Sequence, residues 1–546
     1  MTTTKKIDLI KIYKQKTALV IDDYPDMRGS IRRMLENFGV MGVDTASNGE
    51  EAIRKCEEAH FDIILADYNL GDQKNGQQIL EELRFKNLLK STTVYMMITA
   101  ETTKHMVFGA LEYQPDDYLT KPFTQGVLQK RLDRLVLEKE ALYDINVAMD
   151  RLDFDRAIDL CKERIEMHDK YEQRCYRIMG NCLYKKHKYA QSKQVYQNIL
   201  EERELEWASI GLGKCMMALN ELDEAEKLFG KLIDQGCLCL EIYDCMAEVK
   251  LRQGDADTAQ EILEHAIEIS PNAILRQERL AEISEDNHNW EQAEKARKKV
   301  IRLGSNSVYE TPEHHFKLAR CMNSEMEYSG NQSKLKDVQE VLRMAKRKYK
   351  DRENVDLQSD IIQANAYACA GDKEKSREQI DELQKKLESS SHKSAQLMLD
   401  MAQTYKTLGQ HDKCQGILAD LAETYADNPE ICQAVDRLSD EPLSKQGKQK
   451  AVELNQKGKE LFAAKEYGKA IQLFGQALKH YPNNIGLNLN LMLALVREMS
   501  AKGVTRPQLE RCAEAKQKLA HLDAGNPLHE RYQVLCDHYR KLRASA

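Results

Sequence analysis

Five polar residues in the first quarter of the chain could together perform chemistry, because each one closes or directly follows a short apolar run. They are Asp22, Asp23, Asp67, Thr99 and Lys121. Three carboxylates placed close together repel one another, which raises the pKa of at least one of them unless a cation intervenes. A hard divalent ion with octahedral oxygen coordination would neutralise this repulsion among the carboxylates, and Mg²⁺ is the ion we expect.

The hydroxyl and the amine complete a scheme for phosphoryl transfer. Asp67 would act as the nucleophile and accept a phosphoryl group as an acyl phosphate. Lys121 would neutralise charge on the transferred group, and the hydroxyl of Thr99 would donate to one of its oxygens. Taken singly, Asp23 could merely cap a helix and Lys121-Pro122 could be an ordinary loop. The order of all five residues and their places after apolar runs favour a joint site.

The apolar runs that precede these residues have the length and composition of short β-strands. They occupy residues 18–21, 41–45, 61–66, 93–99 and 118–120. Helical patterns follow them, for example over residues 50–59 after the cap-like pair Ser47-Asn48. Strands that alternate with helices predict an α/β fold with a doubly wound parallel sheet. In such a sheet functional groups gather at the carboxyl ends of the strands, so the five polar residues are expected to converge on one crevice.

Four short segments carry a family resemblance: Ile21-Asp22-Asp23, Asp67, Thr99-Ala100 and Lys121-Pro122-Phe123. They resemble the signature of the response-regulator receiver (CheY-like) domain, which would cover residues 17–135. The resemblance implies a five-stranded flavodoxin-like sheet with Asp67 as the phosphoacceptor. It implies that Mg²⁺ is bound by Asp22, Asp23, Asp67 and the backbone carbonyl of Asn69. It also implies that Thr99 and Lys121 contact the phosphoryl group and that Tyr118 is the aromatic switch.

Two further positions bear on the lifetime of a phosphorylated state. Asn69 and Glu101 lie two residues after Asp67 and Thr99, where side chains influence attack of water on the acyl phosphate. The same pair occurs in chemotaxis-type receivers with short-lived phosphorylation, so the resemblance implies a transient signal. One departure from the family is the segment Tyr113-Gln114-Pro115, where the family often has Gly-Ala. That departure affects a loop and leaves the phosphorylation site intact.

Beyond residue 124 the apolar residues no longer follow the two-residue period of β-strands, and helical patterns repeat instead. Ala225, Ala259 and Ala293 recur at a constant interval of about 34 residues (259 − 225 and 293 − 259). A large apolar residue lies four positions after each of the first two alanines, whereas Arg297 takes that place after the third. The clearest single copy comes late in the chain and consists of Gly458, Leu461, Tyr467, Ala470, Phe474, Ala477 and Pro482. This pattern resembles the tetratricopeptide repeat (TPR), whose helical hairpins stack into a superhelix with a concave surface.

The chain is therefore expected to have several parts. They are an N-terminal extension (1–16), the receiver domain (17–135), a helical junction (136–150), a TPR-like array (151–426), an irregular linker (427–450) and C-terminal TPR-like helices (451–546). Pro429, Pro442 and the weak repeat character of this stretch indicate a linker, or alternatively an irregular helix between two sub-arrays. The last receiver helix is predicted to run on without a break, because no proline occurs from Thr124 through Leu142, and a rigid helical junction is expected to lead into the array.

Composition argues against several classes of protein. The net charge of −7 and the absence of a basic stripe do not favour a nucleic-acid binder. No apolar run approaches the ~20 residues of a membrane-spanning helix, and the polar N-terminus has no signal peptide. A cytoplasmic protein without membrane insertion is expected. The 14 cysteines are scattered through helical patterns and are interpreted as core residues.

The expected function is that of a two-component response regulator, phosphorylated on Asp67 by a sensor histidine kinase. The repeat array would be its protein-binding output, with an unidentified protein or peptide in the groove, or the kinase or another regulator itself. A DNA-binding transcriptional regulator and a constitutive scaffold or phosphate sink are the alternatives. No catalytic motif occurs in residues 150–546. The only catalysis expected is self-phosphorylation from a phosphohistidine donor and autodephosphorylation.

Overall fold

The computed structural model describes residues 9–71, 74–100, 114–237, 239–388, 394–520, 522 and 525–544. The chain divides into two compact units. The first consists of Met1–Asn287 with Glu291–Thr311, and the second of His288–Trp290 with Pro312–Ala546.

The first unit begins with a parallel sheet of five strands in the order β2-β1-β3-β4-β5. The strands are β1 Thr17–Ile21, β2 Gly42–Ala46, β3 Ile63–Asp67, β4 Val94–Thr99 and β5 Asp117–Thr120. All five coincide closely with the predicted runs, so this prediction is confirmed. Every residue of β3 and β4 is buried, as expected for central strands covered by helices on both faces.

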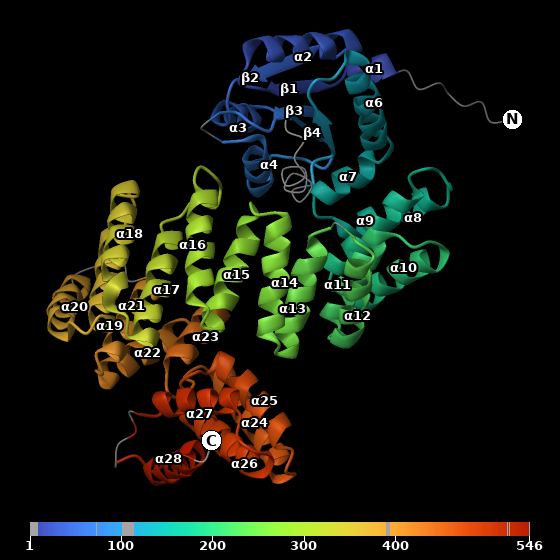
Figure 1. The fold of residues 1–546 in the computed structure, drawn as a ribbon. Coiled ribbons are helices and arrows are strands. Elements are labelled where there is room, and N and C mark those ends of the chain that lie inside the picture. Colours follow the sequence, from blue (N-terminus) through green and yellow to red (C-terminus); the bar gives the residue numbers. More distant parts are fainter. Residues whose placement is uncertain are drawn as a thin grey trace. The chain divides into compact units, whose positions relative to one another are not determined.

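Helices cover both faces of this sheet (Figure 1). They are α2 Pro25–Phe38, α3 Gly49–Glu58, α4 Gly76–Phe85 and α6 Gln125–Ala141. Side chains of α2 and α6 pack on one face, and side chains of α3 and α4 pack on the other. The short α1, Leu9–Tyr13, joins the first of these cores, and the hydroxyl of its buried Tyr13 donates to Asp133 at 2.8 Å. The described part of the predicted N-terminal extension therefore belongs to the sheet domain.

The last helix of the sheet domain is unbroken over the predicted stretch, as α6 Gln125–Ala141, but it does not continue through the junction as the same helix. Helix α6 ends at Ala141, Leu142 adopts φ −108° and ψ 18°, and α7 runs over Tyr143–Asp150. Val136 still packs in the core under the sheet, whereas Leu142 packs in the first core of the array. The chain therefore passes from one core to the other at the break between α6 and α7.

The array continues in the first unit as consecutive helices that pack on one another. They are α8 Phe154–Ile165, α9 Glu172–Lys185, α10 Tyr189–Glu202, α11 Glu206–Ala218, α12 Leu222–Asp234, α13 Glu241–Gln253, α14 Ala256–Ile269, α15 Ile274–Asp286 and α16 Trp290–Gly304. Residues with positive φ recur in the turns, at positions 152, 187, 220, 254 and 288. Their nearly constant spacing supports a helical repeat. Arg297 is buried in place of the missing apolar residue, and its guanidinium donates to Glu285 at 2.9 Å.

Close packing of a glycine against an aromatic ring recurs within these hairpins. A Cβ atom at Gly180 would lie 2.5 Å from the ring of Tyr196, and one at Gly213 would lie 2.4 Å from the ring of Phe229. The ring follows its glycine at the same interval in both pairs, since 196 − 180 equals 229 − 213. In the second unit Phe474 follows Gly458 at that interval too, and a Cβ at Gly458 would lie 2.3 Å from the ring. The small residues of the repeat pattern therefore leave room for the ring of the following helix.

Substitution of Gly213 tests this packing. Gly213→Ala is expected to destabilise the array by about 1–3 kcal/mol, because the new methyl group overlaps the fully buried ring of Phe229. Gly230→Ala in α12 is the matched control, since no atom lies within 4 Å of its added methyl group. That control is expected to stabilise the helix by up to about 1 kcal/mol. Urea denaturation of both variants measures the difference, and equal effects would contradict the packing argument.

The second unit is helical throughout its described residues. Its elements after α16 are α17 Glu313–Ser329, η1 Gln332–Lys334, α18 Leu335–Lys348, α19 Val355–Cys369, α20 Lys373–Glu388, α21 Ala395–Thr407, α22 His411–Thr424, α23 Pro429–Leu438, α24 Lys445–Ala463, α25 Tyr467–His480, α26 Ile485–Lys502, α27 Arg506–Lys518 and α28 His529–Ala544.

The segment predicted as an irregular linker, residues 427–450, is instead ordered as α23 and the start of α24. Pro429 lies in the first turn of α23 behind the cap of Asn428, where a proline starts a helix. The buried Asp436 accepts hydrogen bonds from the backbone N–H groups of Leu443 and Ser444 at 2.8 and 2.9 Å. These bonds hold the turn between the two helices, which the proline content alone did not reveal.

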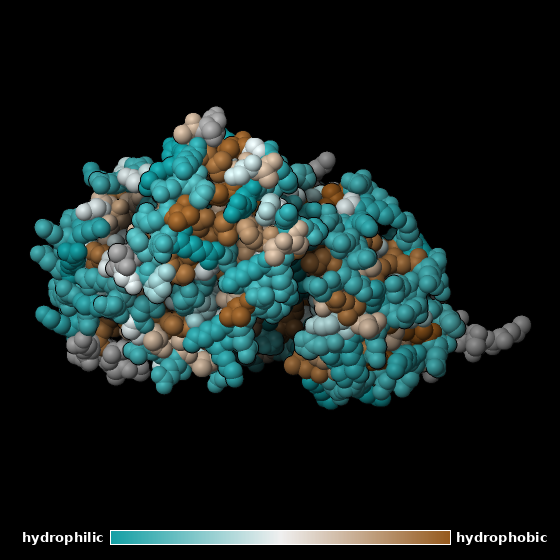
Figure 2. Space-filling view, turned by 90° about the horizontal axis from the view of Figure 1, so that it is seen from below, coloured by the Kyte–Doolittle hydropathy of each residue, from teal (hydrophilic) through white to brown (hydrophobic). Residues whose placement is uncertain are grey.

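Apolar side chains and cysteines lie mainly inside the molecule. Eleven of the 14 cysteines are buried and the other three are partly buried, which agrees with their interpretation as core residues. The face drawn in Figure 2 is largely hydrophilic, with apolar side chains in separate patches. Among the described helices, none combines the length and the apolar character needed to cross a membrane.

Candidate functional site

Three acidic side chains meet at the carboxyl ends of β1 and β3. These strands are neighbours, and Ile21 pairs with Ala66, so the residues that follow, Asp22 and Asp67, come to the same edge of the sheet. Asp22, Asp23 and Asp67 each place a carboxylate oxygen within 4.8 Å of the others. Asp22 and Asp67 are buried, and Asp23 is more exposed. The predicted acidic cluster is therefore present in the structure.

Lys121 links two of these acids. Lys121 directly follows β5. Its backbone N–H donates to the carbonyl of Thr99 at 2.6 Å, and this bond holds the backbone of Lys121 beside the end of β4. Its ammonium group donates to Asp22 at 2.8 Å and to Asp67 at 2.7 Å. Burial lowers the pKa of Lys121, but the hydrogen bonds and charges of the two carboxylates outweigh it and raise that pKa overall.

The carboxyl group of Asp67 lies in an environment that disfavours its charge. Burial is the main cause of its raised pKa, and the neighbouring charge of Asp22 adds to it. The ammonium of Lys121 and a backbone N–H of Asn69 act in the opposite direction without cancelling the effect. The negatively charged form of Asp67 is therefore less stable than in water, and a cation beside it would stabilise that form.

One oxygen of the cluster supports a cation directly. The Oδ1 atom of Asp23 is buried and has no hydrogen-bond partner in the described part of the chain. A buried carboxylate oxygen without a donor is costly unless an ion or water occupies the space beside it. The donors in this cluster are all carboxylate oxygens, which suits a hard divalent cation.

The structure places the other predicted site residues as follows. Thr99 ends β4 and is buried beside the cluster, and Tyr118 lies on β5, half-buried against the core that α3 and α4 form. Asn69 is exposed in the loop after β3. Glu101 lies outside the described residues.

Asn75 and Gln78, which the sequence interpretation did not single out, attach α4 to the phosphoacceptor strand. They form a capping box, in which each side chain accepts from the other's backbone N–H. Gly76 follows, and a Cβ atom there would lie 2.3 Å from the carbonyl oxygen of Asp67. Only glycine fits this contact, so the start of α4 lies directly against Asp67. The spacing Asn-x-x-Gln before an apolar run was the signal available in the sequence.

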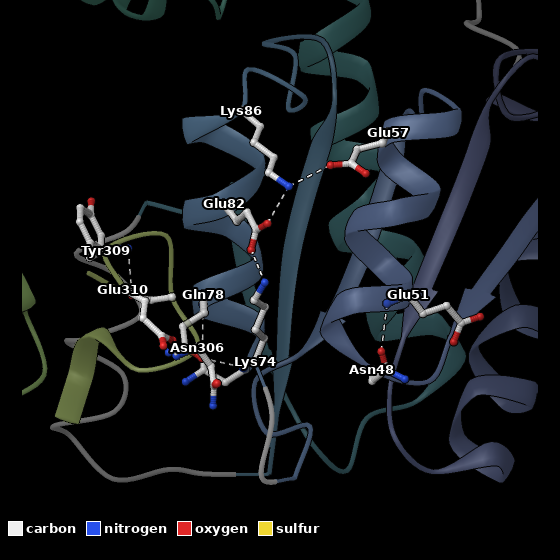
Figure 3. Close-up of polar contacts among 12 residues, drawn as sticks. Asn48, Glu51, Glu57, Lys74, Gln78, Glu82, Lys86, Asn306, Tyr309 and Glu310 are labelled. Carbon is white, nitrogen blue, oxygen red and sulfur yellow. Dashed lines mark hydrogen bonds and ion pairs between the residues drawn. The ribbon is translucent and has the colours of Figure 1, made fainter. Parts of the chain in front are cut away.

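The same glutamine reaches the helical array within the first unit. The amide of Gln78 donates to the carbonyl of Ser305 at 3.2 Å, while its Oε1 accepts from the N–H of Asn75. Figure 3 shows Gln78 beside Asn306 and Glu310 of the loop that follows α16. In that loop the N–H of Asn306 donates to Glu310 at 2.6 Å. One side chain thus joins the cap next to Asp67 to an ordered loop of the array.

The raised pKa of Asp67 predicts how its removal changes stability. Because folding favours the protonated carboxyl, the wild-type protein without metal loses stability as the pH rises through the folded-state pKa of Asp67. Asp67→Asn is therefore expected to be more stable than wild type at neutral pH, and the gain should vanish below the ordinary carboxyl pKa of about 3.9. Thermal unfolding in chelator across this pH range measures it. Asp26→Asn, an exposed neighbour in the first turn of α2, should show no such gain.

Comparison with known proteins concerns the sheet domain. The family of response regulator receiver domains matches residues 18–133. Chemotaxis protein CheY-3 of Vibrio cholerae serotype O1 is 29% identical over 122 residues, which are 22% of this chain and 92% of that protein. Chemotaxis protein CheY of Pseudomonas aeruginosa is 28% identical over 117 residues, which are 21% of this chain and 93% of that protein. A solved structure of Vibrio cholerae chemotaxis protein CheY4 matches at 28% identity, with a TM-score of 0.21, over 22% of this chain and 98% of that one.

Proposed function

We propose that this protein is a response regulator in which a sensor histidine kinase phosphorylates Asp67, because residues 18–133 match the family of response regulator receiver domains. The observation that carries the proposal is the cluster of Asp22, Asp23 and Asp67 with Lys121 bound to two of its members. Asp67 has the position and the carboxylate needed for the nucleophile. Its carboxylate oxygen would form the new bond to phosphorus, and the imidazole of the donor phosphohistidine would leave.

The remaining residues of the site would act on the transferred group. Lys121 already lies 2.7 Å from Asp67, so its ammonium is within reach of a phosphoryl oxygen on that side chain. The hydroxyl of Thr99 would donate to a second oxygen, and movement of that hydroxyl would let Tyr118 turn inward. Asn69 and Glu101 would tune the attack of water that removes the phosphoryl group. We propose no other catalysis for this chain.

The acidic cluster would hold Mg²⁺ through Asp22, Asp23, Asp67 and the backbone carbonyl of Asn69. Bound there, the ion would supply positive charge to neutralise the carboxylates and the phosphoryl oxygens. The Oδ1 atom of Asp23, which has no hydrogen-bond partner among the residues that the structure describes, supports this assignment.

Removal of the carboxylate of Asp23 should weaken Mg²⁺ binding. Asp23→Asn is expected to bind Mg²⁺ at least about tenfold more weakly, because one charged oxygen ligand is replaced by a neutral one. Isothermal titration with MgCl₂ measures the affinity, and Asp44→Asn on β2, exposed and outside the cluster, is the control. Equal affinities of the wild type and the Asp23 variant would place the metal elsewhere.

For the output we propose that the helical region is a TPR-like array that binds protein. The regular spacing of the turns with positive φ and the repeated glycine–aromatic contacts support a stacked repeat. Such arrays present extended concave surfaces, and the partner could be the kinase itself or another regulator. The chain would then be a phosphorylation-switched adaptor.

Contacts within the first unit offer a route from Asp67 to this output. Gln78 joins the capping box beside Asp67 to Ser305 of the array. At the other end of the domain, the N–H of Ser91 donates to Asp150 of α7 at 2.8 Å. A change at the phosphoacceptor that moves the start of α4 would therefore disturb a contact with the array.

Affinity capture from native lysate tests the proposed adaptor. The protein loaded with beryllofluoride, a phosphoryl mimic at Asp67, is compared with an Asp67→Ala variant. We expect a protein to be captured in only one of the two states. Equal capture in both states would contradict the switch and favour a constitutive scaffold or a phosphate sink.

A further inference from the structure

A buried tyrosine on β4 reaches the first turn of α4. The side chain of Tyr95 is 1% exposed and packs in the core that α3 and α4 form with the sheet. Its hydroxyl donates to the backbone carbonyl of Gly76 at 2.8 Å. Burial raises the pKa of Tyr95, so the hydroxyl keeps its proton and acts as a donor. One side chain therefore joins β4 to the start of α4.

The carbonyl of Gly76 does not need this bond. Gly76 is the first residue of α4, and a carbonyl in the first turn of an α-helix already accepts from the N–H four residues later. The core does not need the hydroxyl either, because a phenylalanine at position 95 would fill the same space. The hydroxyl of Tyr95 thus adds a connection that neither helix formation nor apolar packing requires.

This connection lies where the loop after Asp67 closes. The N–H of Gly76 donates to the carbonyl of Tyr68 at 2.9 Å, and the N–H of Tyr68 donates to the carbonyl of Ile98 on β4 at 2.7 Å. A Cβ atom at Gly76 would lie 2.3 Å from the carbonyl oxygen of Asp67 and 3.2 Å from the Cα of Tyr68. The two ends of the loop therefore contact each other, and each end is bonded to β4.

Asn69 belongs to this loop and directly follows Tyr68. Its backbone N–H bonds to the carboxylate of Asp67, and its carbonyl is the ligand proposed above to join the three carboxylates around Mg²⁺. A displacement of Gly76 would pass through its bond with Tyr68 to the residue beside Asn69. Tyr95 itself packs in the apolar core and is not a member of the acidic cluster.

We propose that Tyr95 is a positioning residue for the phosphorylation site, whose hydroxyl holds the loop after Asp67 in the arrangement that binds Mg²⁺. The inference deepens the proposed response-regulator function and rests on it. Without the hydroxyl the start of α4 is free to leave this arrangement. Mg²⁺ then binds only the fraction of molecules that keep it, and the apparent affinity falls in proportion to that fraction.

Isothermal titration of the full-length protein with MgCl₂ tests this role in Tyr95→Phe, which removes only the hydroxyl oxygen. We expect Mg²⁺ to bind about threefold to tenfold more weakly, which corresponds to the net contribution of one hydrogen bond. Tyr13→Phe is the matched control. The side chain of Tyr13 is also 1% exposed, and its hydroxyl donates to Asp133 at 2.8 Å in the core on the other face of the sheet. That variant should bind Mg²⁺ as the wild type does, although it too loses a buried hydrogen bond.

Hydrogen exchange in the presence of chelator gives a second readout that needs no metal. Peptides that contain Gly76 and Gln78 should exchange roughly threefold faster in Tyr95→Phe than in the wild type, because the first turn of α4 opens more often. The same peptides should be unchanged in Tyr13→Phe. A purely structural role of Tyr95 would lower the unfolding temperature without changing the Mg²⁺ affinity of the folded protein.

A Mg²⁺ affinity of Tyr95→Phe equal to that of the wild type would overturn the proposal, as would unchanged exchange at Gly76 or an equal loss of affinity in Tyr13→Phe. Tyr95→Met, which fills the core without a hydroxyl, replaces Tyr95→Phe if circular dichroism shows that variant to be unfolded. Phosphorylation of Asp67 is measured on the same preparations. A wild type that neither binds Mg²⁺ nor is phosphorylated rejects the proposed response regulator. A wild type that does both, with Tyr95→Phe equal to it, rejects the role of Tyr95 alone.

Discussion

An Asp67→Ala variant is expected to take up no phosphoryl group from acetyl phosphate or from a phosphohistidine donor in the presence of Mg²⁺. Asp67 is the buried acid at the end of β3, and the ammonium of Lys121 lies 2.7 Å from its carboxylate. Asp22, another acid of the cluster, accepts hydrogen bonds from the N–H of Tyr24 at 2.9 Å and from the ammonium of Lys121 at 2.8 Å. Its oxygens are therefore already engaged. Intact-mass spectrometry of the protein before and after incubation measures the modification directly.

The control for this experiment is Asp26→Ala, which removes an exposed acid from the first turn of α2 near the site. That variant should be phosphorylated to the same extent as the wild type. A mass increase that persists in Asp67→Ala would assign the phosphoacceptor to another residue. Loss of the increase in both variants would point to a general defect of the domain.

The second large effect is expected at Arg320, whose ion pairs join α17 to α21. Its guanidinium donates to both carboxylate oxygens of Asp400, at 2.7 and 2.8 Å, and to Glu313 at 2.5 Å. Burial alone would lower the pKa of Arg320, but these carboxylates raise it overall. Arg320→Met should destabilise the second unit by about 3 kcal/mol, because Asp400 is left buried without its counter-charge.

Arg343→Met is the matched control for the Arg320 variant. Arg343 is 75% exposed and pairs with Glu340 at 3.5 Å, so its removal should change the free energy of unfolding by less than about 0.5 kcal/mol. Urea denaturation and hydrogen exchange of peptides from α17 and α21 measure both variants. A similar small effect at both positions would mean that the Arg320 pair contributes no net stability.

The sheet domain was largely predictable from the sequence. Buried parallel strands need continuous apolar runs, and the acids, Thr99 and Lys121 had to follow those runs to meet at one edge. This logic identified all five strands and the cluster of Asp22, Asp23 and Asp67. It could not show that Lys121 binds two of these acids at once, since that depends on the distance a side chain spans across β4.

Features that depend on distant contacts were not predictable. Residues 78 and 305 are separated by 227 positions, and nothing in either local pattern indicates their hydrogen bond. The turn between α23 and α24 looked irregular because Pro429 and Pro442 were interpreted as helix breakers. The hydrogen bonds that Asp436 accepts are what orders it. The break at Leu142 was not predicted for a similar reason. The spacing of apolar residues indicates that a side chain is buried, but it does not indicate in which core the side chain packs.

The short interval between Val136 and Leu142 has a consequence for building chimeric proteins. Val136 is the last contribution to one hydrophobic interior and Leu142 is the first to the next, so residues 137–141 are the only helical spacer between them. A gene fusion made within this spacer would leave both interiors whole, provided that the helical phase is kept. One inserted residue would rotate everything beyond it by about 100° about the helix axis. A heterologous sensory module joined here must therefore end in a helix that enters the array in the same rotational phase as the native one.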